Sequence, residues 1–126
     1  MSTFLDIIYY NQLMSLFNLK NKSILITGSS RGIGKSIAEH CALHGAKVII
    51  SSRKIDKCIE TADEINAKVG SELAYPIECN ISDENQLKRL IDESKEKIGA
   101  INVLICNAAT NPFMGSMLDM PIEKFD

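Results

Sequence analysis

Three glycines lie close together directly after a short apolar run, and they are the residues in this chain whose spacing most clearly points to chemistry. Gly28, Gly32 and Gly34 all fall between Thr27 and Lys35. The first permits a tight turn, the second lets the backbone approach an anion, and the third allows a helix to pack closely on a strand. Free backbone N–H groups at the start of a helix favour a phosphate. The cluster therefore predicts a phosphate-binding loop.

Two other interpretations of this loop are weaker. A plain strand-to-helix turn would explain the position, but so many glycines are costly unless something needs the close approach. The end of the segment also looks like a nucleoside triphosphate loop, G-x-x-x-x-G-K-[ST]. However, its leading glycine would have to replace Ser29, and the fourth predicted strand is followed by Asn107 and not by a magnesium-binding Asp. The dinucleotide spacing G-x-G-x-x-G is absent as well.

The elements that position this loop follow from hydrophobic periodicity. Short apolar and β-branched runs predict four strands, at residues 23–27, 47–51, 73–79 and 101–106. Between them, apolar residues recur at helical spacing and predict three helices, which end before Gly45, Gly70 and Gly99. Ser82 is the expected N-cap of the last of these helices, which carries Asp83 and Glu84 in its first turn.

Strands that alternate with helices predict an α/β fold, namely a doubly wound parallel Rossmann sheet. In the strand order 3-2-1-4 the third strand lies at an edge. Pro76 falls in that strand, and proline is confined to edges because it cannot donate to a ladder. Only four strands are found where this fold has at least six, so we expect the sheet to be truncated after the fourth strand.

The loop pattern T-G-x-x-x-G-x-G resembles the cofactor fingerprint of the short-chain dehydrogenases/reductases, and the resemblance covers about residues 16–126. It implies a Rossmann fold and a nicotinamide cofactor. The loop residues that it implies in cofactor binding are Gly28, Ser30, Arg31, Gly32, Ile33 and Gly34.

Two further stretches carry the resemblance. Asn107, Ala108 and Ala109 are similar to the family's N-A-G element after the fourth strand, with alanine in place of the glycine. Asn80 and Ile81 match the family's Asp-hydrophobic pair beside the adenine, with an amide in place of the acid. The run from Asn107 to Gly115 also looks like the branch of NADP-dependent carbonyl and retinol reductases that includes the dehydrogenase/reductase member 4 group.

The end of the second strand favours NADP over NAD. An NAD enzyme places an acid there, on the ribose 2′-hydroxyl, but this chain has Ser52, Arg53 and Lys54. A guanidinium binds phosphate as a bidentate fork, so Arg53 is the better candidate than Lys54, and Arg31 adds charge from the loop. The alternative is a solvated basic turn, but positive charge at a helix N-terminus is mildly unfavourable without a phosphate partner.

The catalytic residues of the family are not found in this chain. The resemblance implies a Tyr-x-x-x-Lys pair with an upstream Ser, but none of the three tyrosines is followed four residues later by Lys. We therefore expect an NADP-dependent oxidoreductase that moves hydride between nicotinamide and a small carbonyl or alcohol substrate, with the 126-residue chain inactive alone. The alternative is a non-catalytic nucleotide-binding fragment or pseudoenzyme.

Composition narrows the remaining possibilities. The chain has 45% hydrophobic residues, 24% charged residues and a net charge of −2, which argues against disorder and against nucleic-acid binding. No apolar run is long enough to span a membrane, and the four cysteines show no C-x-x-C pair, so a reduced cytoplasmic protein is expected. His40 and His44 lack a third ligand, so no metal is predicted.

We divide the chain into two parts. Residues 1–13 are expected to be an extension without stable structure, although an amphipathic arm or a membrane contact is the alternative. Residues 14–126 are expected to be the N-terminal, cofactor-binding part of a Rossmann domain that is incomplete at its C-terminus. The resemblance implies a homo-oligomer for the full-length protein.

Overall fold

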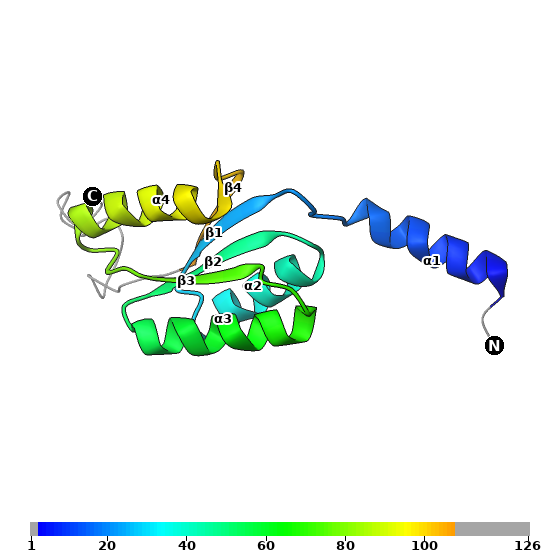
Figure 1. The fold of residues 1–126 in the computed structure, drawn as a ribbon, viewed down its shortest axis with the longest axis horizontal. Coiled ribbons are helices and arrows are strands. Elements are labelled where there is room, and N and C mark those ends of the chain that lie inside the picture. The colour runs from blue at the N-terminus through cyan, green and yellow to red at the C-terminus, as the bar shows by residue number, and fades with distance from the viewer. Residues whose placement is uncertain (1–2, 108–126) are drawn as a thin grey trace, which may run out of the picture.

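A computed structural model describes residues 3–107, which form one parallel sheet with helices on both faces (Figure 1). The strands are β1 (Ser23–Thr27), β2 (Lys47–Ser52), β3 (Ala74–Glu78) and β4 (Val103–Cys106), in the order β3-β2-β1-β4. The helices are α1 (Phe4–Leu16), α2 (Gly32–Leu43), α3 (Ile55–Val69) and α4 (Glu84–Ile98). The predicted α/β fold and the predicted strand order are confirmed.

Alternate residues of each strand build two separate cores, because successive side chains of a strand point to opposite faces. Ile24 and Ile26 of β1 belong to a cluster with residues of α2 and α3, such as Ala38 and Ile65. Leu25, between them, belongs to the second cluster, which contains Leu90 and Ile98 of α4. The two central strands, β1 and β2, are therefore covered on both faces, as the nearly continuous apolar run of β2 predicts. The similar run of β4 predicts the same for that strand, but among the described residues it lies at an edge with Val103 and Leu104 exposed.

The edges of the described sheet carry their own sequence signals. Pro76 lies in β3 opposite Ile50, with no further strand beyond it in the described sheet, which agrees with the edge position predicted for this proline. On the other edge, β4 pairs only with β1 among the described strands. Its side chains Val103 and Leu104 are exposed, whereas Ile105 packs against the core cluster that contains Ile24 and Ile26.

Two helix boundaries depend on side-chain and backbone details. Asp83, and not Ser82 as predicted, caps α4, because its carboxylate accepts hydrogen bonds from the backbone N–H groups of Asn85 and Gln86. Both residues are good caps, and only the turn geometry selects between them. Gly70 ends α3 in the left-handed conformation (φ 77°), as its place after the apolar periodicity predicts.

The N-terminal segment differs from the prediction that residues 1–13 lack stable structure. Residues 4–16 form the helix α1, which projects away from the sheet (Figure 1). Thr3 and Asp6 form a reciprocal capping pair at its start: the Thr3 hydroxyl accepts from the Asp6 N–H, and the Asp6 carboxylate accepts from the Thr3 N–H. The segment contains no glycine or proline that would interrupt a helix, so a helix can continue once the cap has started it. The sequence patterns used above did not predict this helix.

Gly34, in the first turn of α2, lies directly against the residues that follow β1 and β4. A Cβ atom there would collide with the Gly28 carbonyl oxygen and would lie 2.6 Å from the side-chain nitrogen of Asn107. Since the first of these is a backbone atom, the collision has no cheap relief. Glycine at this position therefore sets the distance between α2 and the ends of β1 and β4.

We predict that Gly34→Ala lowers the free energy of unfolding by about 1–3 kcal/mol, because the added methyl overpacks a closed contact. Ser36→Ala, two residues along the same helix on an exposed position, is the matched control and should change stability by less than about 0.5 kcal/mol. Urea unfolding followed by circular dichroism measures both. Equal stability of the two variants would show that α2 can move away from the strand ends freely.

Isoleucines on opposite faces of α3 test the assignment of the core. Ile65 is fully buried and Ile59 is 43% exposed. We expect Ile65→Ala to cost about 2–5 kcal/mol of unfolding free energy, because it leaves a cavity, and Ile59→Ala to cost less than about 1 kcal/mol. The same urea titration separates them, and a larger cost for Ile59→Ala would contradict the orientation of α3.

Candidate nucleotide-binding site

A cavity of about 720 Å³ opens at the carboxyl ends of the parallel strands. This is the edge at which open α/β sheets bind ligands. It is built from the residues that follow β1, β2, β3 and β4, together with the outward face of α3. The lining residues are Gly28, Ser30, Arg31, Gly32, Lys35, Ser51, Ser52, Arg53, Lys54, Lys57, Glu60, Thr61, Cys79, Ile81 and Asn107.

The glycine loop between β1 and α2 forms the floor of this cavity. Gly28 (φ 63°) and Gly32 (φ 61°) both adopt the left-handed conformation that side chains disfavour. No atom lies within 4 Å of the position that a Cβ of Gly32 would take, so the backbone is open to an approaching ligand there. Arg31 precedes α2 with an extended backbone and makes no side-chain cap, which leaves the first N–H groups of the helix available to an anion.

The loop is fixed to β2 through Ser29, which is completely buried. Its hydroxyl donates to the Ile26 carbonyl over 2.7 Å and accepts from the Ser51 N–H over 2.9 Å. Its own backbone N–H donates to the Ser51 carbonyl over 3.0 Å. A buried hydroxyl with both roles satisfied holds the loop at a defined distance from the second strand.

Two more side chains hold the loop from either side. On α3, the Thr61 hydroxyl donates to the Ser30 carbonyl over 2.8 Å. After β4, the Asn107 amide nitrogen donates to the Gly28 carbonyl over 3.0 Å, and the Asn107 backbone N–H donates to the Thr27 hydroxyl over 3.1 Å. The Gly28 and Ser30 carbonyls are thus taken up by protein donors, and the N–H groups at the uncapped start of α2 are left to face a ligand.

Positive charge dominates the side of the cavity nearest β2. Arg31, Arg53 and Lys54 take part in no ion pair within residues 3–107, and Ser52 stands where a carboxylate would exclude a phosphate. The two guanidinium groups can only donate hydrogen bonds, and the Ser52 hydroxyl can donate one as well. This set of donors suits a doubly charged anion.

Two of the three lysines that line the cavity, Lys35 and Lys57, are already paired with acidic side chains of α3. Lys57 lies 3.5 Å from Glu60, the one acidic residue that lines the described cavity. Lys35 lies 2.6 Å from Glu64, and its hydrogen bond and charge lower the pKa of that carboxyl below its ordinary value. These pairs offset the two lysine charges and leave Arg31, Arg53 and Lys54 as the uncompensated ones.

Ser52 is positioned by a cysteine. The Ser52 hydroxyl lies 3.1 Å from the Cys58 sulfur and accepts a long hydrogen bond from the Lys54 N–H, at 3.3 Å. Burial raises the pKa of the Cys58 thiol, so the sulfur is neutral near pH 7 and places no negative charge beside the cavity. The region therefore stays cationic.

The structure brings most of the predicted cofactor residues together. Nine of the residues predicted to bind the cofactor line the cavity: Gly28, Ser30, Arg31, Gly32, Ser52, Arg53, Lys54, Ile81 and Asn107. Gly34 lies behind the loop, Ile33 is 75% exposed outside the cavity lining, and the Asn80 side chain accepts a hydrogen bond from the Ser82 N–H. Ala108 and Ala109 lie outside the described residues.

Sequence reasoning missed several lining residues. They are Lys35, Ser51, Lys57, Glu60, Thr61 and Cys79. A signal existed for part of this set, because positions 54, 57 and 61 recur at helical spacing and so share one face of α3. Ser51 and Cys79 sit inside or just after strands, where no local pattern distinguishes a cavity wall from core.

Comparison with known proteins identifies the family. The family model described as short chain dehydrogenase matches residues 22–126. Dehydrogenase/reductase SDR family member 4 of Bos taurus is 35% identical over 111 residues, which cover 86% of this chain and 38% of that protein. The chain spans about two fifths of the length of the curated relatives it matches.

Solved structures agree with this result. The crystal structure of a short-chain type dehydrogenase/reductase from Mycobacterium marinum has a TM-score of 0.72 and 40% identity, covering 90% of this chain and 44% of that one. A 7α-hydroxysteroid dehydrogenase solved with NADH and 7-oxo glycochenodeoxycholic acid also has a TM-score of 0.72, with 34% identity over 86% of this chain and 41% of that one. On these grounds, the chain belongs to the short-chain dehydrogenase family of oxidoreductases.

Proposed function

We propose that this chain is the cofactor-binding part of an NADP-dependent oxidoreductase that acts on a small carbonyl or alcohol. The observation that carries the proposal is the cationic wall of the cavity at the end of β2, where Ser52 and Arg53 stand in place of a carboxylate. A nicotinamide cofactor, when bound, supplies the hydride transfer. The residues described here bind and orient the cofactor.

The cavity offers a separate place for each charged part of the dinucleotide. The glycine loop and the uncapped start of α2 suit the pyrophosphate, since both present backbone N–H groups. Arg53 and Arg31, which no acidic side chain compensates within residues 3–107, suit the 2′-phosphate of NADP. Ile81, on the far wall, offers an apolar contact for the adenine. Ala108 and Ala109 remain proposed contributors through their backbone.

Charge favours NADP over NAD at this site. A 2′-hydroxyl would leave Arg31 and Arg53, which line the same cavity, without an anionic partner, whereas a 2′-phosphate supplies one. The related 7α-hydroxysteroid dehydrogenase was solved with NADH, so membership of the family alone does not select the cofactor. The choice rests on Ser52, Arg53 and Arg31 of this chain.

The described residues support binding better than turnover. Tyr75 donates its hydroxyl to the Glu72 carbonyl over 3.0 Å and does not line the cavity, and Tyr9 is exposed on α1. Neither of these two tyrosines is placed to donate a proton to a substrate in the cavity. The second candidate function, a non-catalytic nucleotide-binding protein, is favoured by the same observation. Consumption of NADPH by the full-length protein with a panel of aldehydes and ketones decides between the two.

We also propose a cytoplasmic location and a homo-oligomeric full-length protein. All four cysteines are free, and Cys58 and Cys79 are buried thiols, which suits a reducing compartment. No helix among the described residues has the length and apolar character needed to cross a membrane.

The test of cofactor choice is titration of the full-length protein with NADPH and NADH, followed by nucleotide fluorescence. We expect NADPH to bind more tightly, and Arg53→Asp to weaken NADPH binding roughly 10- to 100-fold, because a charge-assisted pair is replaced by repulsion. NADH should bind the variant at least as well as the parent, so that the preference reverses.

Arg89→Asp is the matched control. Arg89 is a half-exposed arginine on α4, paired with Glu93 and outside the cavity lining, so its replacement makes the same charge change elsewhere. It should leave the ratio of the two affinities within about twofold, which is the range expected for a screened surface charge. An unchanged preference in Arg53→Asp would contradict the assignment of the 2′-phosphate to this wall.

A further inference from the structure

The helix α1 presents an unusual amount of apolar surface to solvent. Phe4, Leu5, Tyr9, Leu16 and Phe17 are all at least 60% exposed. Isolated exposed apolar residues are normal in proteins, but several of them at both ends of a projecting helix mark a surface that binds a partner (Figure 1).

The apolar surface is not confined to one side of the helix. Ile7 and Tyr9 are two positions apart, which places them roughly 160° apart around a helix with about 100° per residue, and both are exposed. Asp6, the one charged residue of α1, is engaged in the cap with Thr3. Apolar side chains on more than one side of α1 are therefore open to a binding surface.

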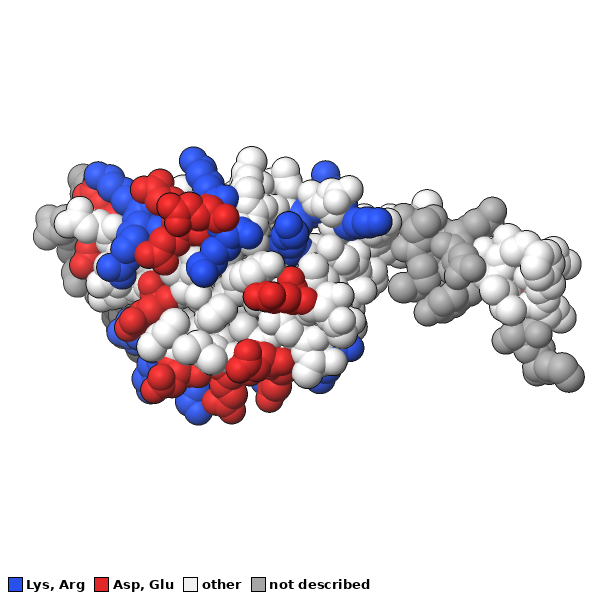
Figure 2. Space-filling view, viewed as in Figure 1, with Lys and Arg blue, Asp and Glu red and all other residues white. Residues whose placement is uncertain are grey.

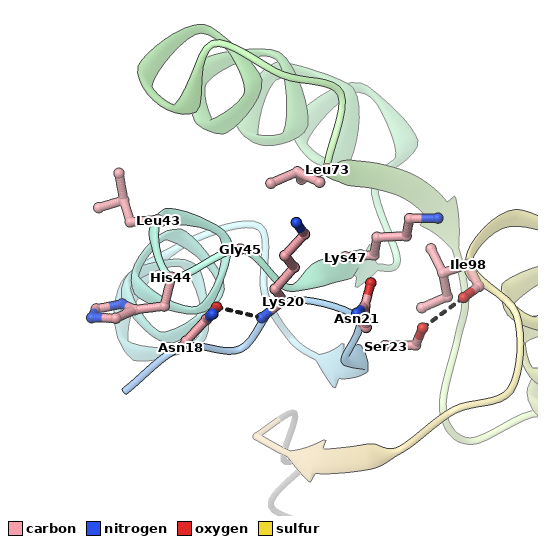
Figure 3. Close-up of a pocket in the computed structure, with 10 residues that line it drawn as sticks. All are labelled: Asn18, Lys20, Asn21, Ser23, Leu43, His44, Gly45, Lys47, Leu73 and Ile98. Carbon is pink, nitrogen blue, oxygen red and sulfur yellow. Dashed lines mark hydrogen bonds between the residues drawn. The ribbon is translucent and has the colours of Figure 1, made fainter. Parts of the chain in front are cut away.

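A group of lysines lies where this helix joins the sheet. We call Lys20, Lys22 and Lys47 the basal lysines. The Lys47 N–H donates to the Lys22 carbonyl over 2.9 Å, and Lys20 and Lys47 both line a second cavity, of about 800 Å³, at the amino ends of the strands (Figure 3). Within residues 3–107 none of the three takes part in an ion pair, and no acidic residue lines this cavity.

The wider surroundings keep the same sign of charge. Glu72 is the acidic residue next in sequence to the lining, and Glu96, two positions before the lining residue Ile98, is flanked by Lys95 and Lys97 at the end of α4. Figure 2 shows basic side chains gathered where the projecting arm meets the globular part. The whole chain is slightly acidic, so this group is a local departure from its average charge.

We propose that α1 and the basal lysines dock on the surface of an anionic lipid bilayer. Neither an apolar helix nor a few lysines gives stable attachment alone, but the two together do, because apolar burial and attraction to lipid phosphates add. The helix has 13 residues, about 20 Å at 1.5 Å per residue, too short for a hydrocarbon core of about 30 Å. It therefore lies in the interface and does not cross it.

The position of this surface suits the rest of the molecule. The basal lysines lie at the amino ends of the strands, whereas the nucleotide cavity opens at the carboxyl ends. A protein docked through α1 therefore keeps its nucleotide cavity directed away from the bilayer. The helix α1 and the basal lysines beside it favour a membrane contact for the N-terminal segment over an extension without stable structure.

The test is flotation of the full-length protein on a density gradient with two kinds of vesicle, phosphatidylcholine alone and phosphatidylcholine mixed with phosphatidylglycerol. We expect flotation with the anionic vesicles, at least tenfold weaker binding to the neutral ones, and loss of binding in high salt. Lys20→Glu combined with Lys22→Glu should weaken anionic binding at least tenfold and leave nucleotide affinity unchanged, which shows that the variant is folded.

Two matched controls separate the lipid contact from general effects. Lys88→Glu with Arg89→Glu makes the same charge change on α4 and should float like the parent protein. Phe4→Ser with Leu5→Ser should reduce flotation at least tenfold, whereas Ile91→Ser, at an exposed apolar position of α4, should not.

Three results would overturn the proposal. They are an absence of flotation, equal binding to neutral and anionic vesicles, and a concentration-dependent dimer that Phe4→Ser with Leu5→Ser abolishes while vesicles bind neither protein. The last result would assign α1 to a second copy of the chain. Since nucleotide titration is independent of all these measurements, failure here leaves the cofactor proposal intact.

Discussion

The nucleotide site depends on the way the glycine loop is held down. Ser29 ties the loop to β2, Asn107 ties it to the end of β4, and Thr61 ties it to α3. Because Asn107 and Thr61 donate to the Gly28 and Ser30 carbonyls, the N–H groups at the start of α2 are left to face a ligand, which is the polarity a pyrophosphate requires. Gly34 completes the arrangement, since its missing side chain lets α2 start directly against the strand ends. An anion site at a helix terminus is otherwise weak and mobile.

The parallel sheet separates the two ends of the molecule by chemistry. Every strand runs in the same direction, so all carboxyl ends meet at one edge and all amino ends at the other. The carboxyl edge gathers the loop, Ser52 and the cationic wall around Arg53. The amino edge gathers the basal lysines below the projecting α1. One sheet thus places two positively charged surfaces at its opposite edges. The surface at the carboxyl edge adjoins the cavity wall that contains Ile81, and the surface at the amino edge adjoins the exposed apolar helix α1.

Local pattern was sufficient for the elements between β1 and β4. Alternation of residues across the strands and helical spacing between them are properties of neighbouring residues, so they can be read from sequence. The failures occur where two local solutions are close in energy. Ser82 and Asp83 are both competent caps, and only the turn before α4 chooses Asp83. The segment before β1 has no strong amphipathic pattern, so the helix α1 depended on a cap formed by Thr3 and Asp6 that the sequence analysis did not weigh.

By itself, the sequence determined the fold class, the strand order, the position of the glycine loop and the absence of a carboxylate after β2. These follow from spacing and residue type alone. Only the tertiary structure decided which side chains share the cavity: Thr61 and Lys57 reach it from α3, whereas Asn80 turns to its own backbone neighbours. The tertiary structure also showed that the basal lysines have no acidic partner within residues 3–107. The physical reason is that burial and pairing are set by residues distant in the chain, which no local pattern contains.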